Sequence, residues 1–509
     1  MPTRPLIIAA LLLLSLPRGE AQNRVARLER HFSALAANGA FNGGVLVAER
    51  GTVRFRKTTG YADFSRSVPL AAGTRFPLAS LSKTITATAV LQLAEAGKLS
   101  VSDPVARHLP GFPYPDIRIR HLLSHTSGLP PYNAYLDSLR SAHPDTSFGN
   151  ADFRAVLLKA PRPLLYAPGA KANYDNVNYL LLALLIEQVA GEPYRTYIGR
   201  HILKPARMTQ TLLLPFRQQY NASAPLPFAY PHLYPYKFSD SLVRAKDVTY
   251  IARYWRTYNF SGFGDLVSTL RDLLRYDEAL YNGRLLKRET LEEAFQPVPL
   301  NDGSLPPTRF GLGWQVGSDS TYGRVVYHNG NATGLSCILL RNISRKQTVI
   351  VFDNVHADNA QPLAFEALRL LNGDAVPLPR KSAAAEYVRL LLHAGCLPAR
   401  ARLRALQADS LRYYLSENEL NDIGYDLMGG PNNPNPYRFA EVRRYPEALE
   451  LFRLVAELFP GSWNAHDSYG EILLLLGRTA EATEEYRRSV QLNPRNEGGK
   501  KALERLTRQ

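Results

Sequence analysis

Ser80 and Lys83 stand three positions apart in the stretch PLASLSKTITATAVLQLAEAG, which runs from Pro77 to Gly97. Positions 80, 83, 87, 90, 91 and 94 share one side at helical spacing, which predicts a helix with Lys83 on its buried face. A serine hydroxyl becomes a strong nucleophile only when a base removes its proton. Burial disfavours an ammonium ion and can lower a lysine pKa by about 3–5 units. Lys83 is therefore a candidate base for Ser80.

Two further groups of residues could complete such a site. Tyr174-x-Asn176 lies just before the apolar run YLLLALLIEQVAG, and His328-x-Gly330 lies in the strand-like stretch YHNGNATGL. A tyrosine hydroxyl and an amide can relay a proton and bind a substrate, and glycine lets a substrate approach a strand edge closely. Taken singly, each group also has an ordinary structural interpretation: a lysine extending to solvent, a helix cap, or a histidine in the core.

The order Ser-x-x-Lys, Tyr-x-Asn, His-x-Gly resembles the serine β-lactamases and penicillin-binding proteins. The Tyr-x-Asn form is similar to the class C branch, which includes D-alanyl-D-alanine carboxypeptidases, esterases and peptidases. The stretches IRHLLSHTSGLP, ILKPARMTQT and RFGLGWQV look like the same family. The resemblance covers roughly Arg24 to Asn372, the greater part of the chain.

The resemblance implies a role for each matching residue. Ser80 is expected to be the acylated nucleophile, Lys83 its proton-transfer partner, and Tyr174 the base and the acid for the leaving group. Substrate contacts are expected from Asn176, His328 and Gly330. The backbone N–H groups of Ser80 and Asn331 are expected to form the oxyanion hole, in which one donor is worth about 10²–10³ in rate.

Three residues depart from the family pattern. Asp175 adds a carboxylate that would raise the pKa of Lys83 if it points inward. His328 stands where class C β-lactamases have lysine, and Asn329 replaces a small hydroxyl residue, so a substrate carboxylate would be held less firmly. These changes favour peptidase or esterase action over β-lactam hydrolysis. His125, in the stretch SHTSG, is expected to be structural.

Composition excludes several classes of function. Of the 509 residues, 45% are hydrophobic and 21% charged, as in a folded soluble protein. The formal net charge of +16 is scattered, without the concentrated basic face or motif of a nucleic-acid binder. Cys and His do not occur at zinc-ligand spacings, and no cofactor is expected. Cys337 and Cys396 are expected to be buried unpaired thiols, although a single bridge is open to them.

The N-terminus has the pattern of a secretory signal peptide. Arg4 precedes the apolar run Leu6–Leu16, and small residues allow cleavage near Ala21. The run is too short to cross a bilayer, and no later stretch is long enough. We therefore expect a secreted or periplasmic protein without a transmembrane segment.

The pattern of apolar and polar residues divides the rest of the chain into domains. The stretches GGVLVAERGTVRFRKTTGYAD and RVVYHNGNATGLSCILLRNISRKQTVIVFDN predict strands at both ends of a first domain, with helices between them. This order predicts an α+β fold: an antiparallel sheet with helices on its faces and a helical subdomain, β-lactamase-like. The boundaries are 1–21 signal peptide, 22–375 hydrolase domain, 376–410 linker, and 411–509 an all-α module.

The last segment has a 34-residue repeat. Ala448 recurs as Ala482, Phe452 as Tyr486 and Pro460 as Pro494. This period resembles tetratricopeptide repeats, in which paired helices stack. The insert GGPNNPNPY lengthens the preceding unit, and a final helix is expected over 497–506. Two repeats fall short of the three usually needed, so we expect them to pack on the hydrolase domain or on the final helix. The module would either stabilise the chain or bind a protein partner.

Together these features predict an exported serine hydrolase that forms acyl-Ser80 from an ester, an amide or a D-amino-acid peptide. Its partner is a small-molecule or peptide acyl substrate, with no nucleic acid. One alternative is a catalytically weak ligand-binding or sensor protein whose repeats bind another protein. A second places the main function in the repeats, as an assembly platform.

Overall fold

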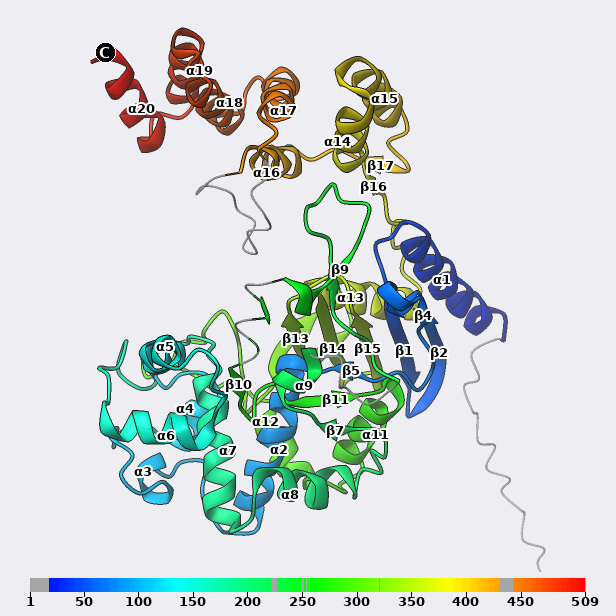
Figure 1. Cartoon of the computed structure of the whole chain (residues 1–509). Coiled ribbons are helices and arrows are strands. Elements are labelled where there is room, and N and C mark those ends of the chain that lie inside the picture. Colours follow the sequence, from blue (N-terminus) through cyan, green and yellow to red (C-terminus); the bar gives the residue numbers. More distant parts are fainter. Residues whose placement is uncertain are drawn as a thin grey trace, which may run out of the picture.

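The computed structural model describes residues 18–220, 227–248, 251–252, 255, 257–319, 321–429 and 443–508. An antiparallel six-stranded sheet forms the centre of the first domain, in the order β12-β13-β14-β15-β1-β2 (Figure 1). The bounds of its strands are β1 Gly43–Glu49, β2 Thr52–Thr59, β12 Gln315–Asp319, β13 Gly323–Ala332, β14 Leu335–Asn342 and β15 Gln347–Asp353. The α+β class predicted from the sequence is confirmed.

Strands from both ends of the domain meet in the middle of this sheet. β1 pairs with β15 from Gly43 opposite Asp353 to Glu49 opposite Gln347. The hairpin predicted around Arg50 and Gly51 joins β1 to β2. β1, β14 and β15 are buried almost throughout, which explains their nearly continuous apolar sequences.

Helices cover both faces of the sheet. On one face, α1 (Arg18–Ala37) and α13 (Ala360–Leu371) pack through residues such as Phe32 and Leu363. On the other, a larger core surrounds α2 (Ser82–Glu95), α7 (Val177–Ala190) and α11 (Leu270–Tyr281). The site motifs belong to this second face.

A helical subdomain extends from the second face and lies at the lower left in Figure 1. Its helices are α3 Val105–His108, α4 Ile119–Leu123, α5 Asn133–Ala142 and α6 Asn150–Lys159, followed by α7 and α8 Tyr194–Ile198. A small sheet of β5 (Phe76–Pro77), β11 (Leu266–Ser268) and β7 (Leu212–Leu213) leads into α2. The helical subdomain and the large sheet therefore meet where the chain enters α2.

The helical module is longer than the sequence predicted. Residues 383–408, assigned to a linker, form α14 (Ala383–Ala394) and α15 (Cys396–Ala408). Their buried residues share one core with α16 (Glu417–Met428) and α17 (Tyr445–Leu458). The end of the strand alternation and the appearance of proline suggested a linker, but the apolar spacing of Tyr387, Val388 and Leu391 buries one side of a helix. We call residues 381–508 the helical region.

The 34-residue period appears as two helix pairs. α17 begins at Tyr445 and α19 (Thr479–Leu492) 34 positions later, and α18 (Trp463–Leu475) and α20 (Glu497–Thr507) have the same offset. Two aromatic residues at equivalent positions pack on a glycine of the helix before their own: Phe452 of α17 on Gly424 of α16, and Tyr486 of α19 on Gly470 of α18. α20 packs through Leu503 on α18 and α19. Residues 430–437 of the insert lie outside the described residues.

A loop of the hydrolase domain contacts the helical region. Between β8 (His232–Leu233) and β9 (Val243–Arg244), Lys237 pairs with Asp422, and Phe238 packs on the core of the helical region. Arg389 of α14 donates to the carbonyl oxygens of Phe238 (3.0 Å) and Ser239 (3.4 Å). In Figure 1 this loop reaches upward beside α14 and α16.

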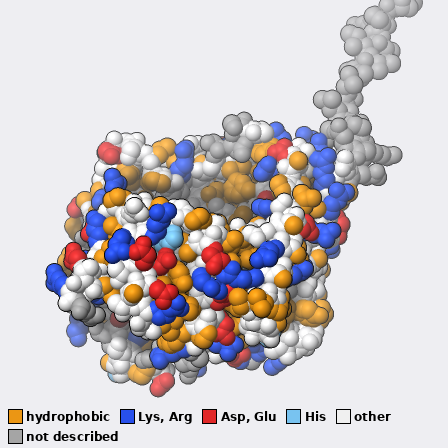
Figure 2. Space-filling view, turned by 90° about the horizontal axis from the view of Figure 1, so that it is seen from above, with side chains coloured by type: hydrophobic (Ala, Val, Ile, Leu, Met, Phe, Trp, Pro, Cys, Tyr) orange, Lys and Arg blue, Asp and Glu red, His pale blue; other side chains and the backbone are white. Residues whose placement is uncertain are grey.

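Other sequence predictions have mixed outcomes. Cys337 is buried and Cys396 partly buried, and neither is bridged. On the face in Figure 2, basic and acidic side chains are interspersed. Within the part of the chain that the structure describes, no helix is long and apolar enough to cross a membrane. α1 already begins at Arg18, before the predicted cleavage near Ala21, while residues 1–17 lie outside the described residues.

Candidate active site

The candidate nucleophile lies in a tight turn before α2. Ser80 is in a short 3₁₀ turn, Ala79–Leu81, and is half-buried. Ala79 has a φ of +42°, a left-handed conformation that costs a residue with a side chain about 1–3 kcal/mol. The turn is held by Leu78, whose N–H donates to the Leu266 carbonyl oxygen at 2.9 Å. This strained backbone aims Ser80 away from the core in which its neighbours Ala79 and Leu81 are buried.

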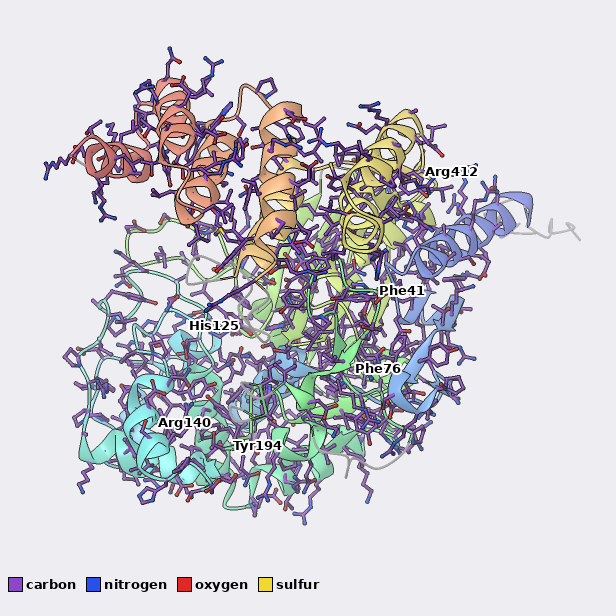
Figure 3. The ribbon with its side chains drawn as sticks, turned by 45° about the horizontal axis from the view of Figure 1, so that its top comes forward. Phe41, Phe76, His125, Arg140, Tyr194 and Arg412 are labelled. Atoms are coloured by element: carbon purple, nitrogen blue, oxygen red, sulfur yellow. The ribbon has the colours of Figure 1, made fainter. Side chains whose placement is uncertain are left out.

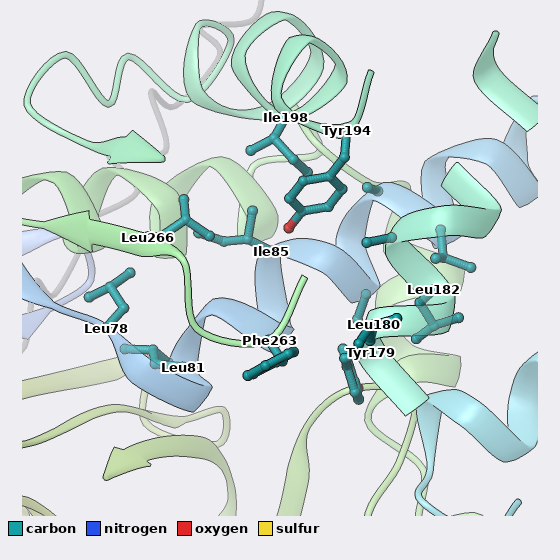
Figure 4. Packing of buried hydrophobic residues seen from close by; sticks show 14 of the residues in the cluster. Leu78, Leu81, Ile85, Tyr179, Leu180, Leu182, Tyr194, Ile198, Phe263 and Leu266 are labelled. Carbon is teal, nitrogen blue, oxygen red and sulfur yellow. The ribbon is translucent and has the colours of Figure 1, made fainter. Parts of the chain in front are cut away.

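The buried stripe predicted for α2 is present. Lys83, Ala87, Val90 and Leu91 are all buried, and Lys83 has no exposed surface. Figure 4 shows the apolar packing around the start of α2, with Leu81 and Phe263 nearby and Tyr179 across from them. Ser82, the first residue of α2, accepts from the Leu266 N–H at 3.3 Å and so has a structural contact.

The Lys83 amine has three oxygen neighbours. Nζ lies 2.8 Å from Ser80 Oγ, 2.8 Å from Asn176 Oδ1 and 3.3 Å from the carbonyl oxygen of Phe263. The last two atoms can only accept hydrogen bonds. A neutral amine has two N–H groups for these two acceptors and keeps its lone pair for the Ser80 hydroxyl. The geometry thus suits an amine that accepts the serine proton.

Electrostatics favour the same protonation state. Complete burial holds the pKa of Lys83 well below its ordinary value, while Asp175 opposes this shift. Burial also raises the pKa of Asp175, whose Oδ1 accepts from the Val177 N–H at 2.8 Å. The carboxylate that the sequence analysis flagged therefore does act on Lys83, in the expected direction.

Tyr174 lies close to both Ser80 and Lys83. The Ser80 side chain lies near enough to act on the pKa of the Tyr174 hydroxyl, and the Tyr174 ring centroid is 4.9 Å from Lys83 Nζ. Although 39% of the side chain is exposed, desolvation around the hydroxyl raises its pKa further above the ordinary value. The phenol is therefore protonated at neutral pH, which suits the acid part of the role that the family resemblance implied for Tyr174, as base and as acid for the leaving group.

His328 is held as a neutral ring. It is 1% exposed, and its Nδ1 lies 2.6 Å from the Asn329 carbonyl oxygen, so Nδ1 must carry the proton. Burial and the nearby Lys83 lower the pKa of His328 to about 3. Nε2 is buried, is a hydrogen-bond acceptor, and has no partner among the described residues.

Gly330 has a packing reason for lacking a side chain. A Cβ there would lie 2.1 Å from the Leu78 carbonyl oxygen and 3.0 Å from the Leu81 nitrogen. β13 thus packs backbone to backbone against the Ser80 turn. Asn331 follows on the same strand, and its side chain donates to Asp358 Oδ1 at 2.8 Å. The expected oxyanion role of the Ser80 and Asn331 N–H groups stays a prediction.

Sequence reasoning missed three contributors. His125, expected to be structural, is buried with its ring 4.2 Å from that of Tyr174. Phe310, part of the stretch RFGLGWQV, contacts the rings of Tyr174 (5.7 Å) and His328 (5.7 Å). Phe263 contributes a backbone oxygen, for which no side-chain signal exists.

Several aromatic residues of the stretch 214–238 pack against other parts of the chain. Phe216 and Phe228 are buried, with Phe216 stacked on Trp255, and Phe238 contacts the helical region. Residues 221–226 lie outside the described residues. Among the residues described, His, Cys, Asp and Glu form no group of three that could hold a metal ion.

Comparison with known proteins identifies the family. The sequence model of the Beta-lactamase family matches residues 25–371. The chain is 33% identical over 369 residues to "Penicillin-binding protein 4*" of Bacillus subtilis, covering 71% of this chain and 79% of that protein. It is 31% identical over 324 residues to "Putative penicillin-binding protein PbpX" of the same organism, covering 62% and 71%.

Solved structures show the same fold. A penicillin-binding protein from Bacillus halodurans matches with a TM-score of 0.55 and 24% identity, covering 66% of this chain and 98% of that one. A D-stereospecific amidohydrolase from Streptomyces sp. matches with a TM-score of 0.55 and 24% identity, covering 69% and 99%. The family match covers the Ser80, Tyr174 and His328 motifs together. The chain belongs to the β-lactamase family of serine hydrolases.

Proposed function

We propose that this protein hydrolyses an ester, an amide or a D-amino-acid peptide through a covalent acyl-Ser80 intermediate. The observation that carries the proposal is the 2.8 Å contact between Ser80 Oγ and the amine of Lys83, a lysine without exposed surface. Such an amine can act as a general base at neutral pH, which a solvated lysine cannot.

Acylation would begin with attack of Ser80 Oγ on the substrate carbonyl carbon while its proton passes to Lys83 Nζ. The N–H groups of Ser80 and Asn331 would stabilise the developing oxyanion. Tyr174 would give its proton to the leaving oxygen or nitrogen as the bond to the carbonyl carbon breaks, and recover one from Lys83. In deacylation, water would lose a proton to Lys83 or Tyr174 and attack the carbonyl carbon of acyl-Ser80. The bond from that carbon to Ser80 Oγ would then break, releasing the acid, and Oγ would recover the proton.

The neutral state of the His328 ring favours substrates without a carboxylate beside the scissile bond. A neutral His328 ring supplies no positive charge to attract a substrate carboxylate, unlike the lysine of class C β-lactamases. A neutral ester or amide does not need that charge. We therefore propose that neutral esters and amides are better substrates than D-peptides or β-lactams carrying a free carboxylate beside the scissile bond.

Labelling with a fluorophosphonate followed by intact-mass spectrometry tests the proposed function. We expect one adduct on the wild type and none on Ser80→Ala, with turnover lowered about 10⁴–10⁶-fold. Ser82→Ala is the matched control: it removes a neighbouring hydroxyl that accepts a hydrogen bond from the Leu266 N–H, and it should keep the adduct. An unlabelled wild type, or a labelled Ser80→Ala, would reject the acyl-enzyme and favour the ligand-binding alternative.

We also propose that the protein is exported and that the helical region is a tetratricopeptide-like module. Arg4 and the run Leu6–Leu16 support cleavage near Ala21, and the same intact masses test it, since the mature chain should begin at Gln22. The 34-residue offset between helix pairs supports a tetratricopeptide-like module. Binding of a protein partner by this module stays a prediction.

A further inference from the structure

We propose that His125 is a positioning residue that holds Tyr174 within reach of Ser80. The proposal rests on the proposed function, because it assigns a task to Tyr174 in acylation. Figure 3 places His125 in the interior, between the helical subdomain and the sheet.

His125 bonds the backbone on both sides of Tyr174. Its carbonyl oxygen accepts from the Asn173 N–H at 2.9 Å, and its Nδ1 accepts from the Asp175 N–H at 3.3 Å. One residue thus fixes the peptide groups before and after Tyr174. Tyr174 precedes α7 in an irregular segment, so neither contact duplicates a helix hydrogen bond.

The imidazole also restrains the Tyr174 ring itself. The two ring centroids are 4.2 Å apart with planes inclined by 34°. Phe310 contacts both rings, at 5.0 Å from His125 and 5.7 Å from Tyr174. Because 39% of Tyr174 is exposed, these rings restrain a side chain whose other side is open to solvent.

The hydrogen-bond network fixes the protonation of His125. Asn178 Oδ1 accepts from Ser127 Oγ at 2.6 Å, which leaves its Nδ2 to donate to His125 Nδ1 at 3.2 Å. An Nδ1 that accepts from Asn178 and from the Asp175 N–H cannot carry a proton. Burial, Lys83 and His328 all lower the pKa of His125, so the ring stays neutral, with its proton on Nε2.

The backbone of His125 supports a positional role as well. Its φ is +60°, in the left-handed region that few residues with a side chain adopt. Such a conformation persists only where the surroundings determine it, and it often marks functional sites. Here it coincides with contacts to Asn173, Tyr174, Asp175 and Asn178, which together define one end of the candidate site.

Two amide replacements separate this role from general packing. His125→Asn puts an acceptor near the position of Nδ1 and tolerates a positive φ, whereas His125→Gln puts its acceptor near Nε2. With a neutral p-nitrophenyl ester, we expect kcat within about fivefold of wild type for Asn and a loss of about 10²-fold for Gln. KM should change less than threefold in both, because substrate contacts remain.

A Tyr174→Phe background provides the decisive comparison. If His125 acts through the phenol, His125→Gln should lower kcat less than about threefold once that hydroxyl is gone. A purely structural effect, including backbone strain, would lower kcat equally in both backgrounds. His121→Asn and His121→Gln are matched controls, because His121 Nδ1 also accepts a backbone N–H, from Arg118 at 3.2 Å, and should leave kcat unchanged.

Three results would overturn the proposal: equal kcat for the Asn and Gln variants, an effect confined to KM, or additivity with Tyr174→Phe. Each is read alongside fluorophosphonate labelling of the wild type. If labelling of Ser80 fails, the proposed function is rejected. If labelling succeeds while His125→Gln keeps full kcat, only the positioning role is rejected.

Discussion

Lys83 lies between two opposing electrostatic influences. Burial favours the neutral amine, and the nearby Asp175 carboxylate favours the ammonium ion. Since only the neutral amine can take a proton from Ser80, the balance sets the pH at which the site becomes active. The acid side of the pH–rate profile should therefore report deprotonation of Lys83 in the free enzyme.

Asp175→Asn should move that acid limb to lower pH. The asparagine keeps an oxygen for the Val177 N–H but removes the charge that raises the pKa of Lys83. The pKa of Lys83 then falls, and a larger fraction of the amine is neutral at any acid pH. Profiles of kcat/KM against pH with an uncharged ester measure the shift.

The matched control is Asp152→Asn. Asp152 likewise accepts a backbone N–H, from Gly149 at 2.8 Å, but does not act on the pKa of Lys83. Its acid limb should coincide with that of the wild type. An acid limb that moves to higher pH in Asp175→Asn would contradict the assignment of Lys83 as the base.

The parts of the candidate site that depend on side-chain type could be predicted from the sequence. The spacing of Ser80 and Lys83 indicated a reactive pair, and the family resemblance of the ordered motifs placed Tyr174 and Asn176 beside it, where the structure has them. The Phe263 oxygen was not predictable, because a backbone atom leaves no mark in the sequence. The contact of His125 depends on a left-handed backbone, which local patterns do not reveal.

At the scale of elements, the approach of β13 to the Ser80 turn determines the shape of the site. Gly330 permits contact with the Leu78 carbonyl oxygen, and the strained residue Ala79 follows Leu78 directly. A side chain at 330 would have to displace either the strand or the turn, because the Leu78 carbonyl oxygen and the Leu81 nitrogen that it would meet are both backbone atoms.

Gly330→Ala should therefore lower both stability and activity. Overpacking of this kind typically costs about 1–3 kcal/mol, and a displacement of Ser80 should lower kcat by about 10²-fold. Thermal unfolding and ester hydrolysis measure the two effects.

Gly317→Ala on the neighbouring strand β12 is the control. There a Cβ would meet a side-chain methyl of Val325 at 3.1 Å, which can adjust. We expect little change in kcat. Equal activities for the two alanine variants would show that the turn and the strand move apart easily.

The elements of the fold were predictable to different degrees. Alternation gave the strands around Arg50 and His328, and the period of 34 gave the helix pairs from Tyr445 onward. The helices over 383–408 were missed, because the strand alternation ends there and proline at 377 and 379 suggested a linker. Their burial depends on partners at α16 and α17 that are distant in sequence.

At the scale of the whole molecule, the cores show where the chain can be divided. The hydrophobic clusters of the hydrolase domain include buried residues only up to Leu371, whereas those of the helical region begin at Ala383. Ending the chain at residue 410, the predicted boundary, would retain α14 and α15 but remove Leu420 and Phe452, which pack in the same cluster.

A chain ending at residue 379 should thus fold better than one ending at 410. We expect the shorter chain to unfold cooperatively with turnover near wild type, and the longer one to bind more of the dye ANS through its exposed apolar face. Calorimetry and dye fluorescence distinguish them. The reverse order of stability would assign α14 and α15 to the hydrolase domain.

The pairing of β1 with β15 has a consequence for synthesis of the protein. The ribosome makes Gly43–Glu49 early, yet that strand acquires its second neighbour only when Gln347–Asp353 emerges. Long-range pairing of this kind folds slowly. The serine at position 80 should accordingly remain chemically inert on a growing chain until nearly the whole first domain has been translated.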